Sequence, residues 1–439
     1  MCTDPPGWTQ LEENKGETIR RGRARRKSGP APRRGSKSTV DEAELGELYG
    51  LEEVPVDTED GWRLIMTRYQ ARPQPYPQPL RGVPLLLVHG YTQNRRAWSS
   101  GEFVKTMLQF GTDLYLLELR GHGKSGIQAQ HRRARQQDSA LPRDIDHGWD
   151  LDSYLLYDLP AAVAAVKRTS GCEQIFFCGH SLGGILGYAY ATLFDDLMGL
   201  VTIGSPSDFS RMPLWLRALG WGPALLFPAL DLGLASFNLA SFLARNLRRA
   251  SGIRVPDGSF KPIHFRRLPF RSFFRWAESN LRRGAHAPLG GGIPFSRPLL
   301  YQPRNVALSA LRPLLREGGN DEPRGTASQF ARWLRRGELV SYRIRHDIAA
   351  AFPRIRIPIA IFFGDEDPFA SVRTTRNVYR SVSSDYLLWR PVRGNSHLDL
   401  TMGYDIRQIC YDVKNLMSYA LDHADARPSS GRRRRTRDQ

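Results

Sequence analysis

The sequence predicts an α/β protein with a mostly parallel central sheet, helices on both faces of that sheet and an inserted helical cap. Short apolar runs alternate with helical patterns between residues 84 and 203, which is typical of a parallel sheet. The alternation stops between about residues 205 and 352, where we expect the cap. It returns at residue 357, so the sheet is expected to be built from two separate parts of the chain.

A predicted hairpin precedes the sheet. Two β-like runs, Glu53–Asp57 and Trp62–Tyr69, flank the residues Glu59-Asp60-Gly61, and an Asp-Gly pair favours a tight turn. A proline-rich link follows at Arg72–Leu80.

Six apolar runs predict the buried strands, because a strand covered by helices on both faces has no polar side. These runs are Pro84–Val88, Asp113–Leu119, Gln174–Cys178, Leu200–Ile203, Ile357–Phe363 and Tyr386–Val392. Helical patterns lie between and after them, at Trp98–Phe110, Asp150–Arg168, Leu182–Leu193 and Asp405–Leu421. Apolar residues recur every three or four positions in the second of these helices, and Pro160 is expected to kink it.

The chain is therefore predicted to have five segments. They are a basic disordered tail at 1–47, the first part of the core at 48–205, the helical cap at 206–350, the second part of the core at 351–425 and an arginine-rich disordered tail at 426–439. Large apolar residues are frequent in the cap between Leu214 and Leu243. They indicate an acyl-binding tunnel or a lid that meets lipid, or else the cap's own core.

Charge is concentrated at the two ends. The chain has 63 Lys and Arg against 44 Asp and Glu, and the segments 15–37 and 427–439 together carry 14 of the net 19 positive charges. Such segments repel themselves and bury little apolar surface, so both are expected to be disordered. An anionic membrane surface or another polyanion is the partner that they would suit, and a merely solvated terminus is the alternative. Specific nucleic-acid binding is not expected, because no aromatic residues are interleaved with the charges.

The cysteines and the N-terminal composition favour a cytoplasmic location. Four cysteines without a Cys-x-x-Cys pair exclude a disulfide scaffold and a zinc ribbon. The first 40 residues contain no apolar signal region. The strongest membrane-span candidate, Leu214–Ala244, is interrupted by Arg217, Pro223, Pro228 and Asp231, so we expect no crossing; a peripheral membrane contact is left open.

The residues Gly179-His180-Ser181-Leu182-Gly183 lie where an apolar strand is expected to meet a helix. In that context the pattern predicts a nucleophile elbow, in which the serine occupies a strained turn and its neighbours two positions away must be small. Its hydroxyl would stand at the N-terminus of a helix, where developing negative charge is favoured. The alternative is a glycine-rich helix N-cap with Ser181 as the capping residue.

A serine nucleophile needs a base and an acid that orients this base. His397 lies in a loop after the last predicted strand, and Asp367 follows the strand Ile357–Phe363; both are therefore expected at the sheet edge that carries Ser181. Asp365 and Glu366 are rival acids, and a loop histidine and a turn acid without catalytic roles are the alternatives.

The strand Pro84–Val88 ends at His89-Gly90-Tyr91. We predict that the backbone N–H groups of Tyr91 and Leu182 form an oxyanion hole. His89 is expected to be a structural support. Gly90, His180 and Trp98 are predicted to contribute to substrate binding.

With these residues in view, the chain resembles the α/β-hydrolases, and among them the acid lipases of the gastric and lysosomal type. The segments that carry the resemblance are Thr58-Glu59-Asp60-Gly61-Trp62, Val88-His89-Gly90, Tyr157-Asp158-Leu159-Pro160-Ala161 and His397-Leu398-Asp399-Leu400, together with Arg120-Gly121-His122-Gly123-Lys124-Ser125, which is shared by α/β-hydrolases in general. The resemblance covers about residues 50–205 and 350–422. It implies a lipase or esterase.

The predicted reaction is hydrolysis of a carboxylic ester with an apolar acyl chain, through an acyl-enzyme on Ser181, and it requires neither a metal nor an organic cofactor. Three alternatives stay open. The acceptor could be an alcohol or thiol, as in an acyltransferase; the enzyme could be another serine hydrolase, such as a thioesterase or peptidase; or the fold could be an inactive binding module.

Overall fold

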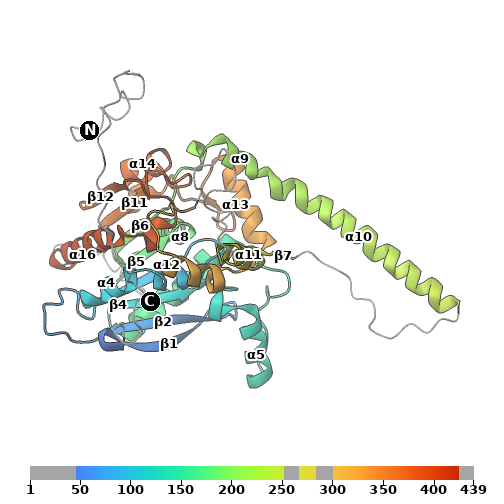
Figure 1. The fold of residues 1–439 in the computed structure, drawn as a ribbon, viewed down its shortest axis with the longest axis horizontal. Coiled ribbons are helices and arrows are strands. Elements are labelled where there is room, and N and C mark those ends of the chain that lie inside the picture. Colours follow the sequence, from blue (N-terminus) through green and yellow to red (C-terminus); the bar gives the residue numbers. More distant parts are fainter. Residues whose placement is uncertain (1–45, 252–265, 283–299, 425–439) are drawn as a thin grey trace, which may run out of the picture. The chain divides into compact units, whose positions relative to one another are not determined.

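The computed structural model describes residues 46–251, 266–282 and 300–424. The basic tails at 1–45 and 425–439 lie outside these ranges, so the predictions for them stay predictions. An eight-stranded sheet has the order β1-β2-β4-β3-β5-β6-β11-β12 (Figure 1). The bounds of its strands are β1 Tyr49–Asp57, β2 Arg63–Ala71, β3 Pro84–Val88, β4 Asp113–Glu118, β5 Ile175–His180, β6 Leu197–Ile203, β11 Ile359–Gly364 and β12 Leu387–Val392.

The predicted α/β class with a mostly parallel sheet is confirmed. β1 and β2 form the predicted antiparallel hairpin, β2 also runs antiparallel to β4, and the pairs from β4 to β12 are all parallel. β11 lies directly beside β6 although about 150 residues separate them in the sequence, so the second part of the core completes the sheet that the first part begins.

Side chains of the central strands alternate between two apolar layers, because successive residues of a strand point to opposite faces. In β3, Leu86 and Val88 belong to one layer, and Leu85 and Leu87 belong to the other. Helices α7 (Leu159–Ser170), α8 (Leu182–Leu193) and α14 (Val372–Ser381) contribute to the first layer. Helices α4 (Phe103–Gln109) and α16 (Ile406–Asp422) contribute to the second.

Two predicted helices are interrupted. The pattern at Trp98–Phe110 divides into α3 (Arg96–Ser99) and α4. The pattern at Asp150–Arg168 divides into α6 (Leu151–Ser153), a π-helical turn at Tyr154–Asp158 and α7. Pro160 lies in the first turn of α7, directly after the π-helical turn, so the helical stretch is irregular at the place where the proline was expected to disturb it.

The segment between β6 and β11 is mainly helical. Its helices are α9 (Leu214–Leu219), α10 (Trp221–Ala250), α11 (Phe270–Arg282), α12 (Leu308–Pro313) and α13 (Arg324–Arg336). Two short antiparallel pairs, which the sequence pattern did not indicate, join β7 (Arg267–Leu268) to β8 (Glu322–Pro323) and β9 (Val340–Ser341) to β10 (His346–Asp347). α10 extends away from the sheet (Figure 1).

Candidate active site

Ser181 occupies a strained turn between β5 and α8. Its backbone has φ 52° and ψ −117°, a conformation that costs energy for a residue with a side chain. A Cβ atom added at Gly179 would lie 2.3 Å from the carbonyl carbon of Gly183, and one added at Gly183 would lie 2.3 Å from the carbonyl oxygen of Val88. Both positions therefore require glycine, which is the geometry of a nucleophile elbow.

His397 and Asp367 meet at the same edge of the sheet. The Nδ1 atom of His397 lies 2.8 Å from Oδ2 of Asp367, and the other carboxylate oxygen accepts the backbone N–H groups of Phe369 and Ala370 at 2.8 and 3.1 Å. Both side chains are buried. With Nδ1–H donated to Asp367, the Nε2 atom of neutral His397 is free to take a proton.

The two rival acids lie elsewhere. Asp365 Oδ1 accepts the backbone N–H of Gly394 at 2.6 Å, which fixes the loop before His397, and Glu366 donates its own backbone N–H to the carbonyl of Asn395 at 3.1 Å. Of the three acids considered, Asp367 is the one in contact with the imidazole of His397.

Ser181 and His397 converge on the end of β6. The backbone N–H of Ser181 donates to the carbonyl of Ile203 at 2.9 Å. A Cβ atom at the next residue, Gly204, would lie 3.3 Å from Nδ1 of His397. Within the described ranges the structure shows no hydrogen bond between the Ser181 hydroxyl and His397; such contacts are often longer in a free enzyme and shorten when substrate binds.

One predicted oxyanion donor, Leu182, follows Ser181 directly, and the other, Tyr91, lies in a loop that approaches the elbow at Gly90. Leu182 is the first residue of α8, so its N–H has no helical acceptor. Residues 89–93, here called the oxyanion loop, turn at Gly90, whose N–H donates to Gln93 Oε1 at 3.1 Å. A Cβ atom at Gly90 would lie 3.1 Å from Cβ of Ser181, so glycine permits the close approach of this loop to the elbow.

Sequence comparisons agree with this geometry. Residues 83–252 match a family model described as the alpha/beta hydrolase fold. The chain is 26% identical to Sterol esterase 2 of Saccharomyces cerevisiae over 147 residues, which are 32% of this chain and 26% of that protein. It is also 26% identical to human Lysosomal acid lipase/cholesteryl ester hydrolase over 155 residues, which are 34% of this chain and 36% of that protein.

The fold is therefore the alpha/beta hydrolase fold, and the chain is similar in sequence to lipases and esterases. It spans only about a quarter to a third of the length of the curated relatives named above. Among solved structures it is similar to an esterase of Pyrococcus furiosus, with 12% identity, a TM-score of 0.46 and coverage of 88% of this chain and 96% of that chain.

Three of the segments that resemble α/β-hydrolase sequences meet at one buried guanidinium. Arg120 is fully buried and donates to Asp158 at 2.8 Å, to Asp60 at 2.6 and 2.9 Å and to Asp144 at 2.9 Å. These carboxylates keep the pKa of Arg120 above its usual value against the opposing effect of burial. Ion pairs of Arg120 therefore connect the loop after β4 to the β1–β2 hairpin and to the turn before α7.

We expect Asp158→Asn to lower the free energy of unfolding by about 3–5 kcal/mol, because it removes one partner from a buried ion pair. The control is Asp57→Asn, which changes an exposed pair with Arg63 and should cost about 0–1 kcal/mol. Urea titration measures both values. Equal, small losses would mean that the buried pair does not join these segments.

Glu322, which no sequence pattern indicates, binds the oxyanion loop. This carboxylate is fully buried, and its Oε1 accepts the backbone N–H of Thr92 at 2.8 Å. Thr92 has φ 65°, an unfavourable value for a β-branched residue. The neighbouring Asn320 donates its backbone N–H to the carbonyl of Thr92 at 2.8 Å and its side-chain amide to the carbonyl of Gln93 at 3.1 Å. Cap residues therefore fix the strained loop.

His122 is the charged partner of Glu322. Its Nε2 lies 3.1 Å from Oε1 of Glu322 and its Nδ1 lies 2.9 Å from the carbonyl oxygen of Arg120; both partners are acceptors, so both ring nitrogens carry hydrogen. Burial opposes this charge, but Glu322 outweighs it and raises the pKa of His122. The neighbouring His89 is neutral, since burial followed by the charge of His122 lowers its pKa to about 3. The ring of His89 contacts the carbonyl oxygen of Gly90 through Nδ1 and accepts the backbone N–H of Leu119 at Nε2, as expected for a structural support.

We expect Glu322→Ala to lower kcat by about 10²-fold with little change in KM, because an oxyanion donor is misplaced while the substrate surface remains. Glu322→Gln retains an acceptor for Thr92 and should lower kcat by about tenfold. The matched control in the cap is Glu317→Gln, whose carboxylate forms exposed pairs with Arg96 and Arg316.

The same variants give a pH test. A histidine whose pKa is raised on folding stabilises the protein below its usual value of 6.5, and this stabilisation is lost as the pH rises through the folded-state value. The melting temperature of the parent should therefore exceed that of Glu322→Gln most below pH 6.5, and the difference should shrink as the pH rises. A difference that grows towards alkaline pH would contradict the assigned charges.

His180 and Trp98 are supports in this structure rather than surfaces open to a substrate. Both are fully buried. His180 Nε2 lies 3.2 Å from the carbonyl oxygen of His397, and burial, followed by the electrostatic influence of the neighbouring His397 ring, lowers the pKa of His180 well below its usual value. Trp98 contacts the rings of Phe103 and His180 at 4.9 and 6.4 Å. We therefore assign both to the packing that positions the His397 loop.

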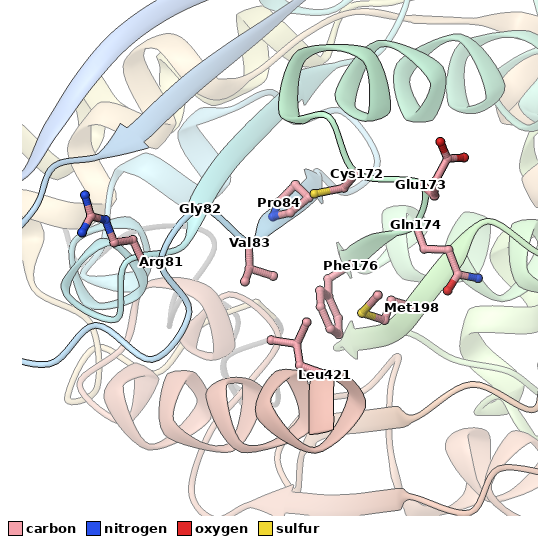
Figure 2. A pocket seen from close by; sticks show the side chains of 10 residues that line it. All are labelled: Arg81, Gly82, Val83, Pro84, Cys172, Glu173, Gln174, Phe176, Met198 and Leu421. Atoms are coloured by element: carbon pink, nitrogen blue, oxygen red, sulfur yellow. The ribbon is translucent and has the colours of Figure 1, made fainter. Parts of the chain in front are cut away.

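A pocket of about 350 Å³ lies at the opposite edge of the sheet (Figure 2). It is lined by residues at or before the starts of β3, β5 and β6, such as Pro84, Gln174 and Met198. The length of β5, about 20 Å, separates this edge from Ser181, so the pocket belongs to another region. Within the described residues no cluster of three or more His, Cys, Asp or Glu side chains could hold a metal ion.

Proposed function

We propose that this chain hydrolyses carboxylic esters with apolar acyl chains by nucleophilic catalysis at Ser181. The observation that supports this most directly is the 2.8 Å contact between His397 and Asp367 at the sheet edge that carries the strained Ser181 turn. Two relatives, a sterol esterase and a cholesteryl ester hydrolase, have names that agree with an ester whose organic parts are apolar.

In the proposed reaction, Ser181 Oγ attacks the ester carbonyl carbon while its proton passes to His397 Nε2. Asp367 stabilises the imidazolium that forms. The carbonyl oxygen becomes an oxyanion that accepts the N–H groups of Tyr91 and Leu182. The carbon–oxygen bond to the alcohol then breaks, and His397 returns the proton to the departing alkoxide.

The acyl-serine is hydrolysed by the same groups in reverse. His397 takes a proton from water, and the hydroxide oxygen bonds to the acyl carbon. Collapse of the second oxyanion releases the carboxylic acid and returns the proton to Ser181. The complete reaction consumes one ester and one water molecule and releases an alcohol and a carboxylic acid.

Half-buried aromatic side chains beside these groups support an apolar acyl chain. Phe369 lies against His397 at 5.0 Å between ring centroids, and Tyr91 stacks on Phe330 at 5.5 Å. The cap helix α13 supplies Phe330, so core and cap both contribute to this aromatic surface. A surface of this kind favours a hydrocarbon chain over a charged or strongly hydrated group.

Covalent labelling tests the proposal. A fluorophosphonate probe should label the parent and should not label Ser181→Ala. A series of p-nitrophenyl esters from two to sixteen acyl carbons should show kcat/KM rising with chain length before solubility intervenes. Absence of labelling in the parent would refute the proposal that the chain is a serine hydrolase. Equal labelling of both proteins would show that the nucleophile is a residue other than Ser181. Addition of alcohol or thiol acceptors, followed by product analysis, would reveal an acyltransferase.

A further inference from the structure

The helix α10 exposes an unusual amount of apolar surface. The stretch Leu214–Ala244, which contains α9 and most of α10, is long and apolar enough to cross a membrane, with a mean hydropathy of 1.4 in its most apolar window and only 6% of that window buried. A core helix would be buried, and this one lies in the middle of the chain rather than near the N-terminus. The interruptions at Arg217, Pro223, Pro228 and Asp231 that argued against a membrane segment do not break α10 itself, which runs through both prolines and Asp231.

The first part of α10 is fixed to α13 of the cap. Asp231 accepts two hydrogen bonds from Arg324 of α13 at 2.7 and 2.8 Å, and the same guanidinium lies 4.5 Å from the ring centroid of Phe227. Arg335 of α13 lies 5.0 Å from the ring centroid of Trp221. The helix is therefore attached at one end, and its direction is set by α13.

Leucines line one exposed face of α10, both within the attached part and beyond it. Leu225, Leu232 and Leu239 are spaced seven residues apart, Leu243 follows four residues later, and each is 51–72% exposed. Phe237, Phe242 and Leu247 are also exposed. Leucines that remain in water cost free energy, so this face requires an apolar partner.

We propose that α10 inserts into one leaflet of a phospholipid bilayer and that the protein is thereby a monotopic membrane protein. Its composition favours lipid over a second copy of the chain. A helix that pairs with another helix carries charged residues beside its apolar seam. Between residues 218 and 244 the only charged side chain is Asp231, and Arg324 neutralises it.

The path of the chain excludes a crossing of the bilayer. α10 is about 45 Å long, and its amino end is bound to α13. The chain returns to β7, which pairs with β8 next to the oxyanion loop, after residues 251–266. A second crossing would need about 20 apolar residues, but this stretch is shorter and contains Arg254, Asp257 and Lys261. Both ends of α10 therefore lie on the same side of the membrane.

Flotation with phosphatidylcholine vesicles tests the proposal on the full chain. The parent should float with the vesicles, and the triple variant Leu232→Gln, Leu239→Gln, Leu243→Gln should bind at least about 100-fold more weakly, because three leucines no longer leave water. The matched control is Leu51→Gln, Leu141→Gln, Leu308→Gln, which changes three exposed leucines outside α10 and should retain parental binding. Melting curves by circular dichroism establish that both triple variants fold.

Two results would overturn the proposal. The first is vesicle binding by the α10 triple variant equal to that of the parent. The second is a parent that does not float but forms a dimer in light scattering, with the dimer lost in the α10 variant, since a second copy would then cover the helix.

Depth measurements separate an in-leaflet helix from a crossing helix. Spin labels at Leu225→Cys, Leu232→Cys, Leu239→Cys and Leu247→Cys, in a chain that also carries Cys2→Ser and Cys172→Ser, should all lie at shallow depths in one leaflet. Depths that pass through the bilayer centre to the opposite surface would refute the monotopic arrangement.

The membrane proposal and the ester hydrolase proposal fail separately. Ser181→Ala should still float with vesicles at the parental level, because binding by α10 requires no reaction at the elbow. A parent that binds vesicles by α10 but hydrolyses no ester would support the membrane proposal and refute the proposed ester hydrolysis. A parent that hydrolyses soluble esters but does not float would do the opposite.

Discussion

A Ser181→Ala variant should hydrolyse a p-nitrophenyl ester with kcat lowered by about 10⁵-fold or more. The methyl group leaves the elbow and the oxyanion donors in place but provides no oxygen to attack the carbonyl. KM should change little, since the aromatic surface that is proposed to bind the acyl chain, at Phe330 and Phe369, does not involve the hydroxyl. Stopped-flow and long-incubation assays together cover this range.

The control for this variant is Ser210→Ala, at an exposed serine whose hydroxyl donates to Asp208. Its kcat should remain within twofold of the parent. A Ser181→Ala protein that keeps more than a tenth of the parental kcat would show that the strained turn after β5 serves another purpose, and would favour an inactive binding module or a different nucleophile.

An Asp367→Asn variant should lower kcat by about 10⁴-fold. In the parent, Asp367 Oδ2 accepts Nδ1–H of His397, which leaves Nε2 unprotonated. An asparagine amide directed at Nδ1 would donate instead of accept, so the imidazole would carry its proton on Nε2 and could not receive one from Ser181. The fold should be retained, because the Oδ1 atom can still accept the N–H groups of Phe369 and Ala370.

Asp365→Asn is the matched comparison, two residues away in the same loop. Its Oδ1 can still accept the N–H of Gly394, so kcat should fall by less than about threefold. A reversed order, with Asp365→Asn inactive and Asp367→Asn active, would assign the orienting role to the rival acid. Steady-state kinetics with one soluble ester decide between the two.

The elbow could be predicted because its requirements are local. A glycine two positions before and after Ser181 is visible in the sequence, and the close approaches at Gly179 and Gly183 explain why no larger residue fits. The sheet could be predicted for a similar reason, since each buried strand is a continuous apolar run. His397 and Asp367 could be proposed from their places after strands, but three acids lay within three residues, and only the turn that directs Oδ1 to Phe369 and Ala370 distinguishes them.

Other features depend on contacts between distant residues, which no local pattern indicates. Glu322 lies 230 positions after Thr92, and nothing in the sequence around it distinguishes it from other acidic residues that precede a proline. Arg120 likewise depends on distant residues, because its three carboxylate partners come from three separate segments. The length of α10 was not predicted, because Pro228 reads as a helix breaker, whereas the helix begins at Trp221 and continues through Pro228.

The binding of the oxyanion loop by Asn320 and Glu322 limits how far this protein could be shortened. A chain trimmed to its sheet, with a linker in place of residues 206–350, would still contain the elbow and the imidazole–carboxylate pair. It would nevertheless leave Thr92 without the acceptor for its N–H, and this residue would relax from its left-handed conformation. The smallest unit able to stabilise an oxyanion therefore includes the inserted helices, and the two regions are expected to be inherited together.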